Sequence, residues 1–360
     1  MLPAGMAISS TTRSSTTRRA ASPCKLNPFL ELVRRRPDGY HDIDTIMVAV
    51  DWVDDVTLTL RNAPALSAAP EIRVRCDWAA DTKNLVDDPE RRDWSLPQDA
   101  DNLVHKALAQ FHRSLQIHIG CPLKVGYHVC IEKRVPSGAG LGGASSNAAT
   151  ALRLAADAVA AEYSISPVHA AHTARAAAAR VGSDVVFFLG QTKPDFGPIQ
   201  AARCTGRGEN VEAVMLTNHV FSGDIRFLIV HPPESVSTAD VYRQCEVPQH
   251  SISAVEHYAG ADAVSGSKGR PLSIDLTIAP TRNRLTAPAR QLSRCVDRLL
   301  SIGERQGLPI SMTGSGSACF AILTDADSIS QAERWRTLLP KGCLSTIAGI
   351  TKTPQSIQLE

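Results

Sequence analysis

The sequence has 360 residues, of which 43% are hydrophobic and 21% charged, with a formal net charge of +2. This length and composition are typical of a globular protein with room for two domains. The small net charge does not indicate nucleic acid as a partner, and no apolar run is long enough to cross a membrane, so we expect neither. The nine cysteines include no CxxC pair, which argues against a disulfide framework or a zinc site and favours a reducing, cytoplasmic compartment.

Residues 1–21 are rich in Ser, Thr and Arg and contain no acidic residue. A plastid transit peptide can have this composition, but the stretch is short, and we favour a disordered tail. The chain then divides into an N-terminal domain over 22–200 and a C-terminal domain over 201–360. In the first domain we expect strands at residues 23–33, 43–50, 56–60, 72–76 and 123–131.

A turn is expected between the first two strands, at residues 34–41, because Pro37 and the Asp38-Gly39 pair favour one. The segments 63–69 and 79–98 have little periodicity and are predicted to be long surface excursions. Helices are predicted at residues 102–115, 146–162 and 166–180, the last beginning at Ser166-Pro167 and ending at Gly182. The apolar run 185–189 is predicted to be a strand.

The second half is predicted to be an α+β domain, with helices on an antiparallel sheet. We expect strands at 225–230 and 317–323 and helices at 287–306 and 328–338. The segment 232–242 is a connection, and 259–271 is a loop rich in Gly, Ser and Ala.

Residues 136–150 contain four glycines within six positions, between a predicted strand and a predicted helix. A helix N-terminus carries unpaired backbone N–H groups and partial positive charge, and glycine lets a phosphate approach the backbone. The sequence therefore predicts a phosphate site here. Its residues are Pro136, Ser137, Gly138, Ala139, Gly140, Leu141, Gly142, Gly143, Ala144, Ser145 and Ser146.

Other interpretations of the glycines are weaker. A dinucleotide fold needs an acidic residue at the end of a second strand, and Glu162 instead ends a predicted helix. A P-loop needs a lysine that this loop lacks. Asp195-Phe196-Gly197 matches a protein-kinase tripeptide, but no HRD sequence accompanies it. A tight turn without function stays open, as it does for the second glycine turn at 313–317, which is either a hairpin turn or part of the active site.

Phosphoryl transfer also needs cations and a group that takes the proton of the acceptor hydroxyl. Asp184 is a candidate base, because it stands at the edge of an apolar segment without a neighbouring Lys or Arg in sequence. An exposed Asp at a helix end is the alternative. Lys25 is an isolated cation within an apolar strand and a candidate partner for Asp184.

These motifs resemble those of the GHMP small-molecule kinases. The resemblance implies a two-domain α+β fold: a mixed α/β N-terminal domain like domain 2 of ribosomal protein S5, a ferredoxin-like C-terminal domain, and an active site in the cleft between them. It also implies ATP as cosubstrate and Mg²⁺. Four further blocks, at 25–27, 36–41, 182–188 and 312–316, resemble one branch, whose members phosphorylate the 2-hydroxyl of a cytidyl diphosphate of methylerythritol for isoprenoid synthesis.

The resemblance implies roles for individual residues. Lys25 and Asp184 are the catalytic pair, with Lys25 holding Asp184 ionised. The substrate-binding residues are Asn27, Tyr40, His41 and Tyr242, the last three around the cytosine ring. No metal ligand is assigned, and we expect a monomer or a weak homodimer.

The sequence departs from the family pattern at four positions, which are Cys24, Ala144, Ser183 and Val186. These are small changes in side-chain volume, and we expect the catalytic chemistry to be retained. Two alternatives stay open. One is another GHMP kinase, for homoserine or mevalonate, although these substrates carry no nucleobase that needs an aromatic site. The other is a non-catalytic nucleotide-binding homologue, against which the presence of Lys25 and Asp184 argues.

Overall fold

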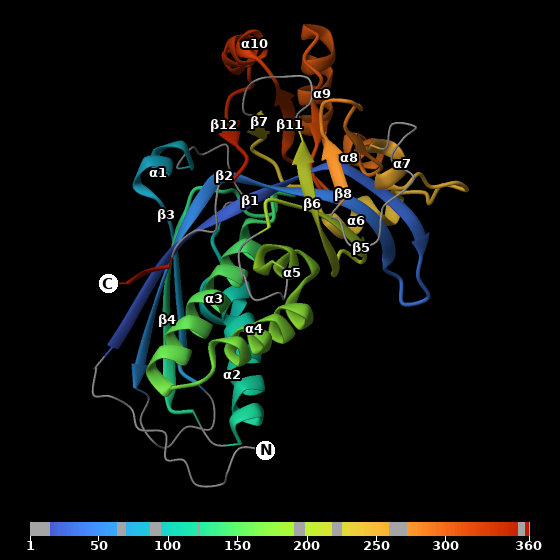
Figure 1. Ribbon diagram of the computed structural model, residues 1–360. Coiled ribbons are helices and arrows are strands. Elements are labelled where there is room, and N and C mark those ends of the chain that lie inside the picture. The colour runs from blue at the N-terminus through green and yellow to red at the C-terminus, as the bar shows by residue number, and fades with distance from the viewer. Residues whose placement is uncertain are drawn as a thin grey trace.

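The computed structural model describes residues 15–62, 70–86, 95–120, 123–190, 199–217, 225–258, 272–351 and 357–359. Two sheets with helices packed against them make up the described chain (Figure 1), which confirms the α+β prediction. The Asp195-Phe196-Gly197 tripeptide and the predicted excursion 63–69 and loop 259–271 lie outside the described residues.

The larger sheet has nine strands. They are β1 (Ser15–Arg35), β2 (His41–Asn62), β3 (Ile72–Trp78), β4 (Val125–Lys133), β5 (Ala201–Gly206), β6 (Asn210–Thr217), β8 (Leu272–Asp275), β9 (Arg282–Asn283) and β13 (Gln358–Leu359). The first two are long antiparallel strands that cross the whole molecule (Figure 1). β2 pairs with β5 over residues 43–48 and with β4 over 55–62, so it joins the two halves of the sheet.

The predicted disordered tail is too long. Residues 15–21 are the beginning of β1, and Ser15 pairs with Arg61 at the far end of β2. From Thr17 to Ala21 partly exposed and buried residues alternate, which is the pattern of a half-buried strand rather than of disorder. Residues 1–14 lie outside the described part of the chain.

A bulge interrupts the pairing of β1 with β2 between Leu26 and Phe29. Leu26 pairs with Val48 and Phe29 with Ile46, so β1 holds one more residue than β2 over this interval. A bulge bends its strand and re-aims the side chains beside it. Here the extra residue falls next to Asn27 and close to Lys25, which is where the sequence predicts the site.

Helices α2 (Leu103–Ile119), α3 (Gly143–Tyr163), α4 (Pro167–Val181) and α5 (Ser183–Leu189) lie together against the larger sheet (Figure 1). α3 packs against α2, α4 and α5, and its many alanines let these helices approach closely. The strand predicted at 185–189 is wrong, because these residues belong to α5. A short, continuous apolar run is compatible with a buried strand and with a buried helix, and here all five side chains are buried in the core of a helical layer.

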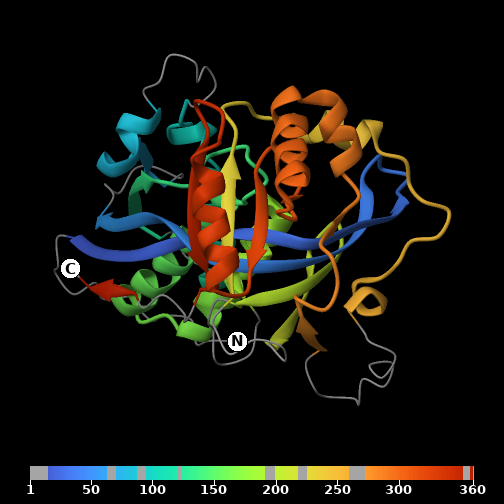
Figure 2. The same ribbon diagram turned by 90° about the horizontal axis from the view of Figure 1, so that it is seen from above.

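The second sheet is antiparallel and contains β7 (Arg226–His231), β10 (Ser311–Met312), β11 (Cys319–Leu323) and β12 (Leu344–Gly349) in the order β10-β11-β7-β12. Helices α9 (Arg294–Gln306) and α10 (Ala326–Arg336) lie over it, as the view from above shows (Figure 2). The single helix predicted at 287–306 is wrong. Ser293 separates α8 (Thr286–Leu292) from α9, and its hydroxyl accepts a hydrogen bond from the Val296 backbone and so caps α9.

Two short helices begin in segments that we expected to be irregular. The excursion 79–98 contains helix α1 (Ala80–Val86), and its residues 87–94 are outside the described part. The connection 232–242 contains the start of helix α6 (Thr238–Gln244). Two further short elements are a 3₁₀ helix at Asp99–Asp101 and α7 (Ala254–Tyr258).

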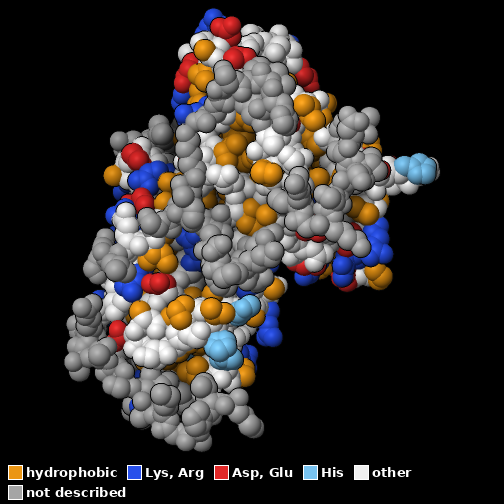
Figure 3. All heavy atoms as spheres, in the orientation of Figure 1, with side chains coloured by type: hydrophobic (Ala, Val, Ile, Leu, Met, Phe, Trp, Pro, Cys, Tyr) orange, Lys and Arg blue, Asp and Glu red, His pale blue; other side chains and the backbone are white. Residues whose placement is uncertain are grey.

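The predicted domain boundary at residue 200 falls inside the larger sheet. β5 begins at Ala201 and pairs with β2, and the smaller sheet begins only at β7. On the face drawn in Figure 3, Lys and Arg side chains of the described residues stand next to Asp and Glu side chains. This mixture agrees with the small net charge of +2.

Candidate active site

The phosphate loop, residues 134–142, connects the end of β4 to the start of α3. Gly138, Gly140 and Gly142 have φ angles of +67°, +75° and +69°. Conformations of this kind point successive backbone N–H groups toward one concave space, where an anion can bind. Because α3 begins directly after this loop, its free N-terminal N–H groups add to the same site.

The phosphate loop packs directly on the second glycine turn, residues 313–317. A Cβ atom at Gly140 would collide with the carbonyl oxygen of Thr313 and stand 3.1 Å from the backbone nitrogen of Gly316. The backbone N–H of Ala318 donates to the carbonyl of Ala139 at 3.0 Å. The second turn therefore lies against the phosphate loop, rather than serving only to connect β10 and β11.

Lys25 of β1 is buried between these two glycine segments. Its ammonium donates to the Oδ1 atom of Asn27 and to the carbonyl oxygen of Gly140, both at 2.5 Å. A Cβ atom at Gly142 would stand 3.1 Å from the Lys25 Cγ atom, and one at Gly314 would stand 3.0 Å from Nζ. Burial lowers the pKa of Lys25 from its ordinary value, and the carboxylate of Asp184 opposes this shift.

Asp184 lies in the first turn of α5 and is partly exposed. Its carboxylate is near enough to Lys25 for the negative charge to oppose the lowering of the Lys25 pKa. Within the residues that the structure describes, however, Lys25 and Asp184 form no ion pair. Lys25 instead bonds to Asn27 and Gly140, so the direct pairing that we expected is not present in this structure.

Asn27 positions Lys25. Its buried amide accepts from Lys25 Nζ and from the hydroxyl of Thr313, at 3.2 Å for Thr313, and donates to the hydroxyl of Thr45 at 2.9 Å. The Asn27 backbone N–H also donates to the Thr313 hydroxyl at 3.0 Å. These bonds hold β1, β2 and the second glycine turn together around the ammonium.

The aromatic residues predicted to contact the cytosine ring separate into two groups. The rings of His41 and Tyr242 lie 5.5 Å apart at an interplanar angle of 32°. Burial and, to a smaller extent, the Asp184 carboxylate raise the pKa of Tyr242, so Tyr242 lies near both His41 and the candidate base. Tyr40 is 59% exposed, and its ring contacts the guanidinium of Arg207 at 5.3 Å from the ring centroid.

His41 is suited to hydrogen bonding in its neutral form. Burial lowers the pKa of His41, and the charge of Arg35 lowers it further. A neutral imidazole has one N–H donor and one ring-nitrogen acceptor. The His41–Tyr242 pair can therefore supply ring stacking and hydrogen bonds to a ligand.

The two predicted serines of the phosphate site differ. Ser145 is partly exposed, whereas Ser146 is fully buried and accepts a hydrogen bond from the hydroxyl of Ser22 at 2.8 Å. The Ser145 hydroxyl is thus the one of the two that a bound phosphate can reach in this conformation.

The sequence analysis did not identify Asn283 as a functional residue. The Asn283 amide donates to the carbonyl oxygens of Met312 and Gly314 at 2.8 and 2.9 Å, and so holds the second glycine turn. Next to it, Arg284 donates to Glu31, which is fully buried on β1. The Asn283 amide can donate two hydrogen bonds, but the sequence does not show which groups accept them. Only the fold brings the two carbonyl oxygens within reach.

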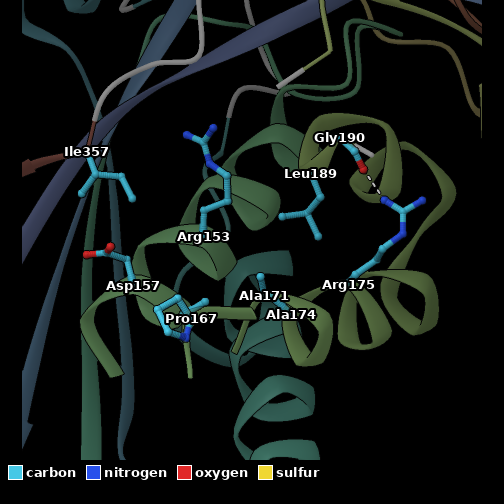
Figure 4. Close-up of a pocket in the computed structure, with 10 residues that line it drawn as sticks. Arg153, Asp157, Pro167, Ala171, Ala174, Arg175, Leu189, Gly190 and Ile357 are labelled. Carbon is cyan, nitrogen blue, oxygen red and sulfur yellow. Dashed lines mark hydrogen bonds between the residues drawn. The ribbon is translucent and has the colours of Figure 1, made fainter. Parts of the chain in front are cut away.

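A cavity of about 230 Å³ lies elsewhere, between α3, α4 and the end of α5 (Figure 4). Alanines and Leu189 form much of its lining, and Arg175 at its edge turns to the carbonyl of Gly190. It contains none of the predicted site residues, so it is separate from the candidate active site.

Comparisons with known proteins decide the family. The model "GHMP kinases N terminal domain" matches residues 102–191, and "GHMP kinases C terminal" matches residues 274–341. The 4-diphosphocytidyl-2-C-methyl-D-erythritol kinase of Rhodopirellula baltica is 37% identical over 332 residues, which are 89% of this chain and 92% of the relative. This chain belongs to the 4-diphosphocytidyl-2-C-methyl-D-erythritol kinase family. The resemblance noted in the sequence is confirmed.

Solved structures agree with this family on the fold. A crystal structure of 4-(cytidine 5'-diphospho)-2C-methyl-D-erythritol kinase has a TM-score of 0.58 at 24% identity and covers 92% of this chain and 99% of that chain. The homoserine kinase from Cytophaga hutchinsonii has a TM-score of 0.55 at 14% identity, with 97% and 98% covered. The predicted two-domain GHMP-kinase fold is therefore confirmed. No helix among the described residues is long and apolar enough to span a bilayer.

Proposed function

We propose that the chain transfers the γ-phosphoryl group of ATP to the 2-hydroxyl of 4-diphosphocytidyl-2-C-methyl-D-erythritol, giving the 2-phosphate and ADP. This is a step of the non-mevalonate route to isoprenoid precursors. The observation that carries the proposal is the position of Tyr242. Its ring lies 5.5 Å from that of His41, and the Asp184 carboxylate contributes to the raised pKa of Tyr242. A site for a nucleobase thus adjoins the candidate proton acceptor.

The phosphate loop and the N-terminus of α3 bind the phosphates of ATP through backbone N–H groups, and the Ser145 hydroxyl adds a side-chain contact. Lys25, fixed against the Gly140 carbonyl, offsets the negative charge that spreads over the transferred group. Asp184 takes the proton of the attacking hydroxyl. Asn27 serves this site by orienting Lys25.

Mg²⁺ that accompanies ATP neutralises phosphate charge. The Ser145 hydroxyl fits this ion, because it is an oxygen donor on a partly exposed side chain in the first turn of α3, directly after the phosphate loop. We further propose that the protein acts in the bacterial cytoplasm, as a monomer or weak homodimer. The Rhodopirellula baltica relative and the eight described cysteines, which form no disulfide, support this location.

An ADP-release assay tests the reaction. The cytidyl substrate, mevalonate and homoserine are offered separately with Mg-ATP, because GHMP kinases for the last two substrates share the fold. We expect turnover with the cytidyl substrate alone and a loss of about 10²–10⁴-fold in kcat for Asp184→Asn, the usual contribution of a general base. Asp157→Asn, a carboxylate of α3 that pairs with Arg18, is the matched control. Turnover with mevalonate or homoserine alone would overturn the substrate, and an unchanged kcat in Asp184→Asn would overturn the base.

A further inference from the structure

A fully buried carboxylate lies beneath the phosphate loop. Asp54 of β2 has no exposed surface. Its Oδ1 atom accepts from the backbone N–H groups of Arg134 and Val135 at 2.7 and 2.8 Å. Its Oδ2 atom accepts from the amide of Asn147 at 2.9 Å and from the ammonium of Lys133. Four donors thus surround one carboxylate.

These donors stand at the two ends of the phosphate loop. Lys133 is the last residue of β4, and Arg134 and Val135 are the first residues of the loop. Asn147 follows the loop, near the beginning of α3. Asp54 therefore joins the point where the chain enters the loop to the point where it leaves, two places that the loop itself separates.

Further hydrogen bonds of Lys133 and Asn147 extend the network to Ser22 and Ser146. The Lys133 ammonium also donates to the Oδ1 atom of Asn147 at 3.1 Å, and a Cβ atom at Gly143 would stand 3.2 Å from it. Lys133 is therefore directly behind the first residue of α3. The hydroxyl of Ser22 accepts from Asn147 at 2.9 Å and donates to Ser146 at 2.8 Å, which adds β1 to the same network.

Fold stability alone is a weak explanation for this arrangement. Removing two charges from water costs several kcal/mol per ion, and apolar residues of the same volume often hold a core equally well. What a saturated, buried polar network adds is a fixed geometry for the groups attached to it. Here those groups are the backbone segments that present N–H donors to phosphate, and such donors act best when they are oriented in advance.

We propose that Asp54 is a positioning residue for ATP, which acts through Lys133 and Asn147 to hold the phosphate loop and the N-terminus of α3 in the geometry that binds the nucleotide. This inference rests on the proposed function only in taking the loop as the ATP site. It predicts that a defect in the network weakens the binding of the nucleotide and leaves the binding of the second substrate unchanged.

Asp54→Asn tests the inference, since it keeps the size of the side chain and removes its charge. Asp55→Asn is the matched control, because Asp55 is the next residue of β2 and pairs with Arg134 and Arg19 outside the buried network. The ADP dissociation constant is measured by calorimetry without acceptor, and the KM values for ATP and for the cytidyl substrate in the coupled assay. For Asp54→Asn we expect the dissociation constant for ADP and the KM for ATP each to rise at least tenfold. The KM for the cytidyl substrate should change by less than twofold. Asp55→Asn should change each value by less than twofold.

A folded Asp54→Asn variant that binds ADP within twofold of wild type would overturn the inference, as would equal increases in both KM values. The double variant Asp54→Asn/Lys133→Met separates positioning from stability, because it removes both charges. We expect it to recover melting temperature relative to Asp54→Asn while nucleotide binding stays weak. Recovery of both together would show a purely structural role.

Ser22→Ala provides a readout even if Asp54→Asn does not fold, because it leaves the charge pair intact and removes the bridge between Asn147 and Ser146. We expect a loss of at least threefold in ADP affinity, and an unchanged affinity would overturn the inference. The calorimetry needs no acceptor, so it also separates this inference from the proposed function. Wild-type protein that binds ADP but does not phosphorylate the cytidyl substrate would refute the proposed reaction and leave the comparison of dissociation constants valid.

Discussion

The ammonium of Lys25 donates a hydrogen bond to the carbonyl oxygen of Gly140 at 2.5 Å. A cation from the first strand is thereby attached to the backbone of a loop that lies more than a hundred residues later in the chain. Because the loop carbonyl and the Asn27 amide hold this cation, its position does not depend on an ion pair with Asp184. In the proposed reaction Lys25 faces the transferred phosphoryl group and the Asp184 carboxylate takes the proton of the hydroxyl.

Lys25→Met should lower kcat/KM by about 10²–10³-fold, the usual effect of removing one preorganised donor from a site of developing charge. Lys341→Met, at an exposed lysine before β12, is the control and should leave the rate unchanged. Steady-state kinetics with the cytidyl substrate give the measurement. A Lys25→Met rate within a few-fold of wild type would exclude Lys25 from the reaction.

Gly140→Ala should weaken ADP binding by at least tenfold, because its Cβ atom would push the phosphate loop away from Thr313. Gly307→Ala is a matched control. Its φ of +67° is close to the +75° of Gly140, but a Cβ atom there meets no atom within 4 Å. Both variants bear a similar backbone strain of about 1 kcal/mol, so calorimetry isolates the effect of the contact. Equal ADP affinities in the two variants would contradict the role of this contact.

Tyr242→Ala and His41→Ala should raise the KM for the cytidyl substrate and leave the KM for ATP within twofold. Stacking of a base on an aromatic ring contributes about 1–3 kcal/mol, so we expect increases of about 5- to 100-fold. Tyr40→Ala, at the exposed ring beside Arg207, should have a smaller effect. If Tyr40→Ala gave the largest increase of the three, the base would bind on the Arg207 side instead.

Stability should fall between pH 7 and pH 4.5 because of His112. Burial of its ring on α2, beside the Tyr127 hydroxyl, lowers the pKa of His112 from 6.5 to about 4. Between these values the unfolded chain binds a proton that the folded protein excludes. The stability from the neutral ring is therefore complete above pH 6.5 and is lost as the pH falls toward 4.

Denaturant unfolding at the two pH values gives the measurement for His112. Wild type should lose about 2 kcal/mol more than His112→Gln, whose side chain also reaches a hydroxyl but does not titrate in this range. Parallel losses in the two proteins would show that other groups cause the pH dependence.

Local patterns in the sequence predicted much of the architecture. The strands at 23–33, 43–50 and 56–60, the helix after the glycines and the Ser166-Pro167 start of α4 were each predicted from neighbouring residues. β1 is longer than predicted, 43–50 and 56–60 are parts of the single strand β2, and α3 begins three residues earlier. The strand predicted at 185–189 was wrong because burial on every side removes the periodicity that distinguishes a strand from a helix. The break at Ser293 was missed because both flanking segments have helical composition.

The sequence by itself determined the family and predicted the chemistry of the site, since the glycine loop, Lys25 and Asp184 belong to local motifs that can be recognised without a structure. Tertiary structure alone decided how these parts meet. The contact of Gly140 with Thr313, the Asn283 bonds to the second glycine turn and the attachment of Asp54 to both ends of the phosphate loop join segments that are far apart in the chain. Hydrogen bonds of this kind require two groups to meet at about 3 Å, and only the packing of the strands and helices sets such distances.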